Sequence, residues 1–265
     1  MSKLVDRLER LAEGRGQPLG FGAALNREKA LPMLAVASLP SPSAGLATTA
    51  AGAGADAVLF EVENWQKEKQ ALSELSSTAK AGPWGVHMRA PTAESVKELA
   101  AMKCDFAVFT ADKTPAALLV QDELARIIQI SPSLDDSLAK AVGRLGFDAV
   151  LLAPDKGEEY PLTLQRLLVY ERLVAAAGRH ILATVPESMP LDDLGALWVL
   201  GARGLVIEAP PGKMESRLAE VREAIAKLPT KRRRPRDRFG VTLPRAADSS
   251  PAAPPDEEDD DEEDY

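Results

Sequence analysis

The stretch "GADAVLFEVE" (54–63) recurs in altered form three more times, as "KCDFAVFTAD" (103–112), "GFDAVLLAPD" (146–155) and "GARGLVIEAP" (201–210). Each copy opens with glycine or a polar residue, which is typical of a helix end. Each then continues into a β-branched or leucine-rich run, typical of a buried parallel strand. A spacing of about fifty residues predicts a repeated βαβα unit, a quarter of an eight-stranded barrel.

Apolar segments of strand length alternate with helical segments along the whole chain. The expected strands are residues 32–38, 56–63, 83–90, 105–111, 126–131, 147–153, 180–186 and 204–209. This alternation predicts an α/β protein with a parallel sheet, and eight units predict a (β/α)8 TIM barrel. An open doubly wound sheet would show the same local sequences. No G-x-G-x-x-G motif follows the first strand, which argues against the dinucleotide-binding form of that alternative.

Residues 1–229 form the expected barrel domain, with an extra N-terminal helix predicted by the apolar spacing within residues 4–12. Two helix boundaries carry clear capping signals. Thr92, with Ser95 in the capping-box position, is expected to cap one helix. Ser133 is the expected N-cap and Gly146 the expected C′ residue of another.

Residues 230–265 differ from the rest of the chain. They are basic in "KRRRPRDR", then rich in Pro and Ser, then acidic, which predicts a disordered tail. The last ten residues hold nine carboxylates, and removing these charges from the formal net charge of −8 leaves +1. The acidic run can screen the basic run, which has no interleaved aromatic residues, and both features argue against nucleic-acid binding.

Composition bounds the class of protein. The chain has 265 residues, of which 45% are hydrophobic but only 5% aromatic, so the core must consist of Leu, Val, Ile and Ala. It contains no apolar run of about eighteen residues, so no membrane span is expected. The charged N-terminus lacks an apolar signal core, which favours a cytoplasmic location. A single cysteine, Cys104, permits no internal disulfide, and no Cys/His metal spacing occurs.

The second and third strands carry the candidate catalytic groups. If the bulky Val58, Phe60 and Val62 face the helices, Glu61 and Glu63 face the barrel interior. The same alternation places His87 and Arg89 at the mouth. In TIM barrels the catalytic groups lie at the carboxyl ends of the strands.

These four side chains suggest acid–base chemistry on a small anion. Glu61, Glu63 and His87 can take and give protons, and Arg89 can bind a carboxylate or phosphate. A structural salt-bridge network would use the same residue types. Packing alone is the less favoured explanation, because burying four charged groups is costly.

Other strand ends add candidates for substrate binding. They are Ser38 on the first strand, Gln129 on the fifth and Glu208 on the eighth. Glu61, Glu63, His87 and Glu208 could together hold a divalent metal, although no spacing demands one. Lys113 and Lys156 follow strands four and six and are better explained as exposed loop lysines than as Schiff-base nucleophiles. His180 begins the seventh strand at the opposite end and is expected to be structural.

The chain resembles the aldolase-type TIM-barrel superfamily over roughly residues 20–228. The resemblance rests on the strand order, on "GADAVLFEVE" and on "VPESMPLDDLGALWVLGARGLVIEA" (185–209), which is similar to the end of phosphate-binding barrels. Those families hold a phosphate on backbone N–H groups after strands seven and eight. This sequence has "PESM" and "EAPPGK" at those places, and proline has no N–H to donate. The departure weakens the expectation of a phosphorylated substrate.

Together these features predict a lyase or isomerase that acts on a small carboxylate- or carbonyl-bearing metabolite by His/Glu acid–base chemistry. The alternative is a non-catalytic barrel that binds a ligand or acts as a scaffold. The expected partner is a small molecule. The exposed faces of the barrel helices could also pair subunits in a homo-oligomer.

Overall fold

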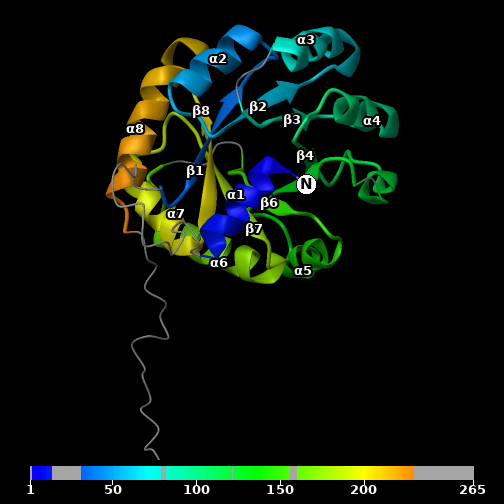
Figure 1. Ribbon diagram of the computed structural model, residues 1–265. Coiled ribbons are helices and arrows are strands. Elements are labelled where there is room, and N and C mark those ends of the chain that lie inside the picture. The colour runs from blue at the N-terminus through cyan, green and yellow to red at the C-terminus, as the bar shows by residue number, and fades with distance from the viewer. Residues whose placement is uncertain (1, 14–30, 79–81, 121, 156–159, 230–265) are drawn as a thin grey trace, which may run out of the picture. The chain divides into compact units, whose positions relative to one another are not determined.

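Eight parallel strands form a closed barrel in chain order. The computed structural model describes residues 2–13, 31–78, 82–120, 122–155 and 160–229. The first strand pairs in parallel with the eighth, which closes the ring. The predicted (β/α)8 TIM barrel is therefore confirmed, and the open doubly wound sheet is excluded (Figure 1).

Each predicted strand is present. The strands are β1 (Leu34–Leu39), β2 (Ala57–Val62), β3 (Trp84–Met88), β4 (Phe106–Thr110), β5 (Ala125–Ile130), β6 (Ala149–Leu152), β7 (His180–Val185) and β8 (Ala202–Glu208). The described α-helices are α1 (Lys3–Ala12), α2 (Ala44–Gly52), α3 (Trp65–Thr78), α4 (Ala93–Ala101), α5 (Asp136–Arg144), α6 (Leu164–Ala177), α7 (Leu194–Leu200) and α8 (Met214–Lys227). Short 3-10 helices are η1 (Ala116–Val120), η2 (Leu191–Asp193) and η3 (Pro211–Lys213). Between β4 and β5 the described residues form η1 and no α-helix.

The fourfold sequence repeat marks the turn from a helix into an even-numbered strand. Its first residue has a positive φ in every copy: Gly54 (93°), Lys103 (60°), Gly146 (73°) and Gly201 (120°). Glycine adopts this conformation without steric cost, which explains its use in three of the four copies. The repeat therefore records a backbone requirement of the fold.

An aspartate two residues later joins each of the first three copies to the preceding strand. The backbone N–H of Asp56 donates to the Ala35 carbonyl at 2.7 Å, and that of Asp148 donates to the Arg126 carbonyl at 2.9 Å. The carboxylates of Asp56 and Asp148 in turn accept hydrogen bonds from the backbone N–H groups of Ala35 and Arg126, at 2.8 and 2.7 Å. The aspartate thus satisfies backbone groups that have no ladder partner at the start of the strand.

The core has two layers, as the alternation along the strands predicts. Val58, Phe60 and Val62 pack between the barrel and its helices. Ala57 and Leu59 belong instead to a second cluster inside the barrel. The predicted phase of β2 is confirmed.

Helix α1 closes the amino end of the barrel. Leu4 and Leu8 are fully buried and belong to the cluster inside the barrel. Asp105, the aspartate of the second copy of the repeat, anchors this helix by accepting from Ser2 Oγ and from the backbone N–H groups of Lys3 and Leu4 at 2.8–2.9 Å. Figure 1 shows α1 lying across the ring of strands. The predicted extra helix is confirmed.

Two predicted caps are correct and a third is wrong. Gly146 follows Leu145, the C-cap residue of α5, with a positive φ, as expected of a C′ glycine. Thr92 and Ser95 form a reciprocal capping box at the start of α4. Ser133, however, does not cap α5, because that helix begins at Asp136 and its N-cap is Asp135. Asp135 Oδ1 accepts from the N–H of Ser137 at 2.8 Å, whereas Ser133 hydrogen-bonds Ser131. A carboxylate also suits the positive end of the helix dipole.

Two further predictions concern the C-terminal tail and membrane-spanning segments. The expected C-terminal tail, residues 230–265, lies outside the described residues. In the part of the chain that is described, no helix combines the length and apolar character needed to cross a membrane.

Candidate active site at the carboxyl ends of the strands

Polar side chains replace apolar ones at the carboxyl end of the barrel interior. Leu34 and Val36 of β1 lie inside the barrel, and the alternation carries Ser38 to the same face. The same step on other strands gives a set that we call the polar ring: Ser38, Glu61, His87, Thr110, Gln129, Thr184 and Glu208. On β6 the equivalent step reaches Ala153. The layers beneath this ring are apolar, so the polarity is confined to the mouth.

Glu61 and His87 form the central contact of the polar ring. They are direct neighbours in the register of β2 and β3. His87 Nδ1 lies 3.0 Å from each carboxylate oxygen of Glu61, and the side chains are 20% and 41% exposed. A carboxylate at Nδ1 favours the tautomer with its proton there, which leaves Nε2 free to accept a proton. This is the arrangement of an oriented general base.

Glu208 lies close enough to Glu61 and His87 for their charges to affect its pKa. It is exposed at the end of β8, and Ser38 of β1 is its register partner. Desolvation by the surrounding strand ends raises the pKa of Glu208, the negative charge of Glu61 raises it further, and His87 opposes both. The raised pKa favours the protonated form of this carboxyl group, which is the form that can donate a proton.

The other members of the ring are neutral and lack partners. Among the described residues, the side chains of Ser38, Thr110, Gln129 and Thr184 form no hydrogen bond. Ser38 and Thr184 are each only 8% exposed, and Thr110 Oγ1 is fully buried. A buried polar group without a partner costs about 1–3 kcal/mol. Of the four, only the Thr110 hydroxyl is fully buried; the polar atoms of Ser38, Gln129 and Thr184 remain accessible, so a ligand at the mouth could pair with them.

Glu63 and Arg89 do not join the polar ring. Both follow the last residues of their strands, and Arg89 Nη2 contacts Glu63 Oε1 at 3.0 Å. Their side chains are 72% and 65% exposed, so this is a solvated surface ion pair. The structure therefore separates the four charged residues expected at one site into two pairs.

The loops after β7 and β8 are tied to each other. Lys213 Nζ donates to Glu187 Oε1 at 2.6 Å. The Arg217 guanidinium donates to the carbonyl oxygens of Met189 and Pro186, at 2.6 and 3.4 Å. Lys213 and Arg217 at this end of the barrel thus both have protein partners.

Two other possibilities raised by the sequence were a Schiff-base lysine and a divalent-metal site. Lys113 is exposed in the loop after β4, whereas Lys156 lies outside the described residues. Within the described ranges, no group of three or more His, Cys, Asp or Glu side chains is arranged to hold a metal ion. Glu61, His87 and Glu208 are neighbours, but they do not form such a cluster.

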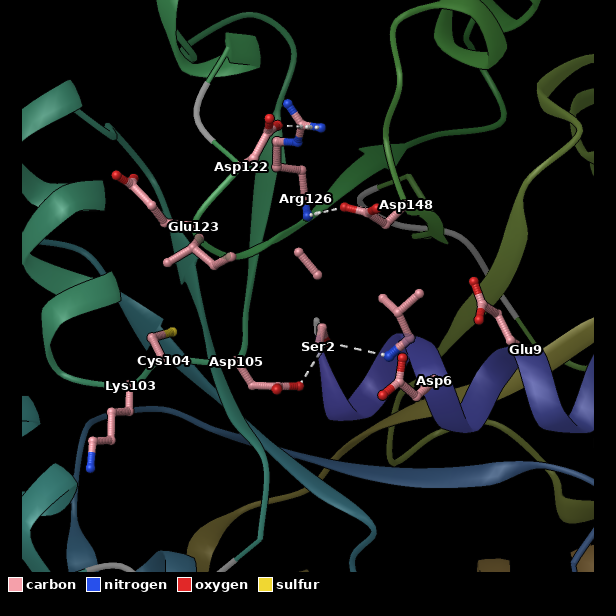
Figure 2. A pocket seen from close by; sticks show the side chains of 13 residues that line it. Ser2, Asp6, Glu9, Lys103, Cys104, Asp105, Asp122, Glu123, Arg126 and Asp148 are labelled. Atoms are coloured by element: carbon pink, nitrogen blue, oxygen red, sulfur yellow. Dashed lines mark hydrogen bonds and ion pairs between the residues drawn. The ribbon is translucent and has the colours of Figure 1, made fainter.

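A cavity of about 550 Å³ opens at the opposite, amino end of the barrel (Figure 2). Its acidic lining residues are Asp6, Glu9, Asp105, Asp122, Glu123 and Asp148. Figure 2 shows Asp105 facing Ser2, and Asp148 facing the backbone of Arg126. These contacts hold α1 and the strand starts in place, in keeping with the structural role of this face in TIM barrels.

The second histidine and the cysteine also lie at the amino ends of strands. His180 is the first residue of β7, and desolvation lowers its pKa. Cys104 precedes β4, is buried, and has its thiol pKa raised by that burial. Neither residue is near the polar ring, in agreement with the structural roles expected for them.

The sequence reasoning missed Thr184 and assigned no role to Thr110. Both are found by extending the inward alternation, from Val108 to Thr110 and from Leu182 to Thr184. The register shift between β7 and β8 leaves Arg203 of β8 unpaired and does not interrupt the alternation along β7.

No protein-family model matches the chain, and no curated protein sequence matches it. Solved structures do match. Tryptophan synthase of Mycobacterium tuberculosis superposes with a TM-score of 0.62 at 13% identity, covering 84% of this chain and 98% of that one. Phosphoribosyl anthranilate isomerase of Thermus thermophilus gives 0.56 at 16% identity, covering 73% and 98%.

An HpcH/HpaI aldolase of Desulfitobacterium hafniense gives a TM-score of 0.57 at 15% identity, covering 83% of this chain and 96% of that one. At these identities the similarity establishes the fold. The chain thus has the fold of the aldolase-type TIM barrels, as its sequence predicted.

Proposed function

We propose that this protein is an enzyme of the lyase or isomerase type that moves protons on a small carbonyl compound. The observation that carries the proposal is the 3.0 Å contact between Glu61 and His87 Nδ1 inside the polar ring. An imidazole oriented by a carboxylate, at the end of a barrel where TIM-barrel enzymes place their catalysis, is a competent general base.

The proposed chemistry uses the free nitrogen of that imidazole. His87 Nε2 removes a proton from the carbon next to the carbonyl, and the electron pair of that C–H bond moves toward the carbonyl oxygen. Glu208, whose pKa is raised, protonates that oxygen to give an enediol. For a hydroxycarbonyl substrate, His87 then returns its proton to the former carbonyl carbon while the second hydroxyl of the enediol gives its proton to Glu208, which completes an isomerisation. A lyase of this type would instead expel a leaving group from the carbon next to the enediol.

The structural neighbours are consistent with this class. They include an isomerase, an aldolase and a synthase, so this fold supports chemistry of several kinds. Fold similarity alone does not assign a reaction, because one barrel supports many unrelated sites. The residues of the polar ring carry the proposal.

A second candidate is a non-catalytic barrel that binds a ligand or acts as a scaffold. The pairing of Glu63 with Arg89 and of Glu187 with Lys213 favours it, since a barrel without catalysis would neutralise its rim charges in this way. The unpartnered side chains of the polar ring favour the enzyme instead. We retain a small-molecule ligand, a cytoplasmic location and pairing of subunits as further parts of the proposal.

Deuterium exchange tests the function whatever the final product of the reaction is. The full chain is incubated in D2O with small hydroxycarbonyl compounds and with 2-oxo acids, and NMR follows loss of the C–H signal next to the carbonyl. The wild type is expected to catalyse exchange on at least one compound. His87→Gln and Glu61→Gln should each slow it by about 10²–10⁴-fold.

Arg10→Gln, on the far end of the molecule in α1, is the control and should keep full exchange. Unchanged melting temperatures would show that the site variants still fold. Exchange that persists in His87→Gln would contradict the proposal, and exchange absent from the wild type across the panel would favour the non-catalytic barrel.

A further inference from the structure

The neutral members of the polar ring indicate the kind of ligand it takes. Ser38 and Thr184 are more than nine-tenths buried, lie on inward-facing positions, and have no hydrogen-bond partner among the described residues. Thr110 and Gln129 share this lack of a side-chain partner and are register neighbours on β4 and β5. Hydroxyl and amide groups both donate and accept, so they match a ligand rich in hydroxyl groups.

The charged members of the ring disfavour an anion. Glu61 and Glu208 are carboxylates, and the one basic group in the described ring, His87, is already in contact with Glu61. A phosphate or carboxylate placed among them would meet like charge in a partly desolvated mouth. Carboxylates, by contrast, accept hydrogen bonds from hydroxyl groups of an uncharged ligand.

The described cations at this end of the barrel lie outside the ring. Arg89 is paired with Glu63, Lys213 with Glu187, and the Arg217 guanidinium bonds the carbonyl oxygens of Met189 and Pro186. Lys113 is exposed in the loop after β4. The anion binding that Arg89 was expected to provide therefore has no counterpart in the geometry of the ring.

We infer that the polar ring binds an uncharged polyhydroxylated carbonyl compound, of the kind represented by a free aldose or ketose, in preference to its phosphate ester or to an oxo acid. Only one part of this inference rests on the proposed function, namely that the ligand contains a carbonyl group. Its hydroxyl-binding part depends on Ser38, Thr110, Gln129 and Thr184.

Titration calorimetry on the full chain tests this inference with matched ligands. The panel is D-ribose, D-fructose, the terminal phosphate ester of each, pyruvate as the oxo acid and D-glucosamine as the amine. At least one free sugar should bind, and at least tenfold more tightly than its phosphate ester or pyruvate. Ser38→Ala and Thr184→Val should each weaken that binding about tenfold, because each removes one hydroxyl and little volume.

Thr48→Val is the matched control, because Thr48 lies on the exposed face of α2 and bonds only its own helix, at Ala44. It should bind as the wild type does. Thr184→Val should keep the wild-type melting temperature, so lost binding can be read as lost contact. Tighter binding of a phosphate ester, pyruvate or the amine than of either free sugar would overturn the inference, as would no binding of either sugar.

The same samples separate this inference from the proposed function. A free sugar that binds through Ser38 and Thr184 but exchanges no C–H proton in D2O would uphold the ligand class and contradict the enzyme. An oxo acid that binds and exchanges through His87 would uphold the enzyme and contradict the ligand class.

Discussion

The two ends of the barrel use polar residues in opposite ways. At the amino end, Asp56, Asp105 and Asp148 accept hydrogen bonds from backbone N–H groups at strand or helix starts. At the carboxyl end, Ser38 and Thr184 are just as firmly placed but bond to nothing among the described residues. Polar groups that are satisfied within the fold stabilise it, whereas the unpaired hydroxyl groups at the carboxyl end are available to pair with a ligand.

The hydrogen bonding of the polar side chains is a better guide to the candidate site than the size of a cavity. The cavity of about 550 Å³ lies at the amino end, yet two of its carboxylates, those of Asp105 and Asp148, bond the starts of α1 and β5. Volume alone would have directed attention to that face. The bonding state of the lining residues directs it to the polar ring instead.

The largest expected effect on stability is at the amino end. Asp105→Ala removes three hydrogen bonds that anchor the start of α1. The free energy of unfolding should fall by about 2–3 kcal/mol. Urea denaturation measures it. Asp112→Ala, at an exposed loop position, is the matched control and should change the free energy by less than about 0.5 kcal/mol.

Thr184→Val extends the same measurement to the carboxyl end. Because its hydroxyl has no partner to lose, the free energy of unfolding should change by less than about 0.5 kcal/mol. Equal losses in Asp105→Ala and Thr184→Val would erase the distinction between the two ends.

A smaller and pH-dependent effect is expected at Glu208. Its pKa is raised in the folded state, so the stability it contributes is full below the ordinary pKa of 4.5 and is lost as pH rises through the raised value. Glu208→Gln should therefore raise Tm by about 1–2 °C at pH 7 and leave it unchanged at pH 4.

Glu171→Gln, on the exposed face of α6, is the control and should show no such pH dependence. A Tm gain of equal size at both pH values would mean that the carboxyl group of Glu208 is not destabilised by its surroundings.

Most of the fold could be read from the sequence, and the reason is local. The repeat records a positive φ at the helix end in all four copies and, in three of them, an aspartate bonded to the preceding strand. The alternation of Val58 and Phe60 with Leu59 fixed the phase of β2 for the same reason. Local backbone rules of this kind leave a direct trace in the residue order.

The candidate site was harder to predict from the sequence beyond the ends of the strands, where alternation no longer applies. Glu63 and Arg89 lie past the ends of β2 and β3, so alternation no longer determines their direction, and they pair at the surface. Thr184, by contrast, follows the uninterrupted alternation of β7 from Leu182 and could have been found from the sequence. Pairing across strands and loops depends on three-dimensional contacts that spacing along the chain does not encode.

The chain has two histidines, and the barrel places them at opposite ends: His87 in the polar ring, and His180 at the start of β7. NMR of their imidazole signals during titration with D-fructose and D-ribose tests the central claim most directly, with His180 as the internal control. We expect the His87 signals to shift with saturation while those of His180 stay fixed. A saturating shift at His180 with none at His87 would place the ligand at the amino end and contradict the account.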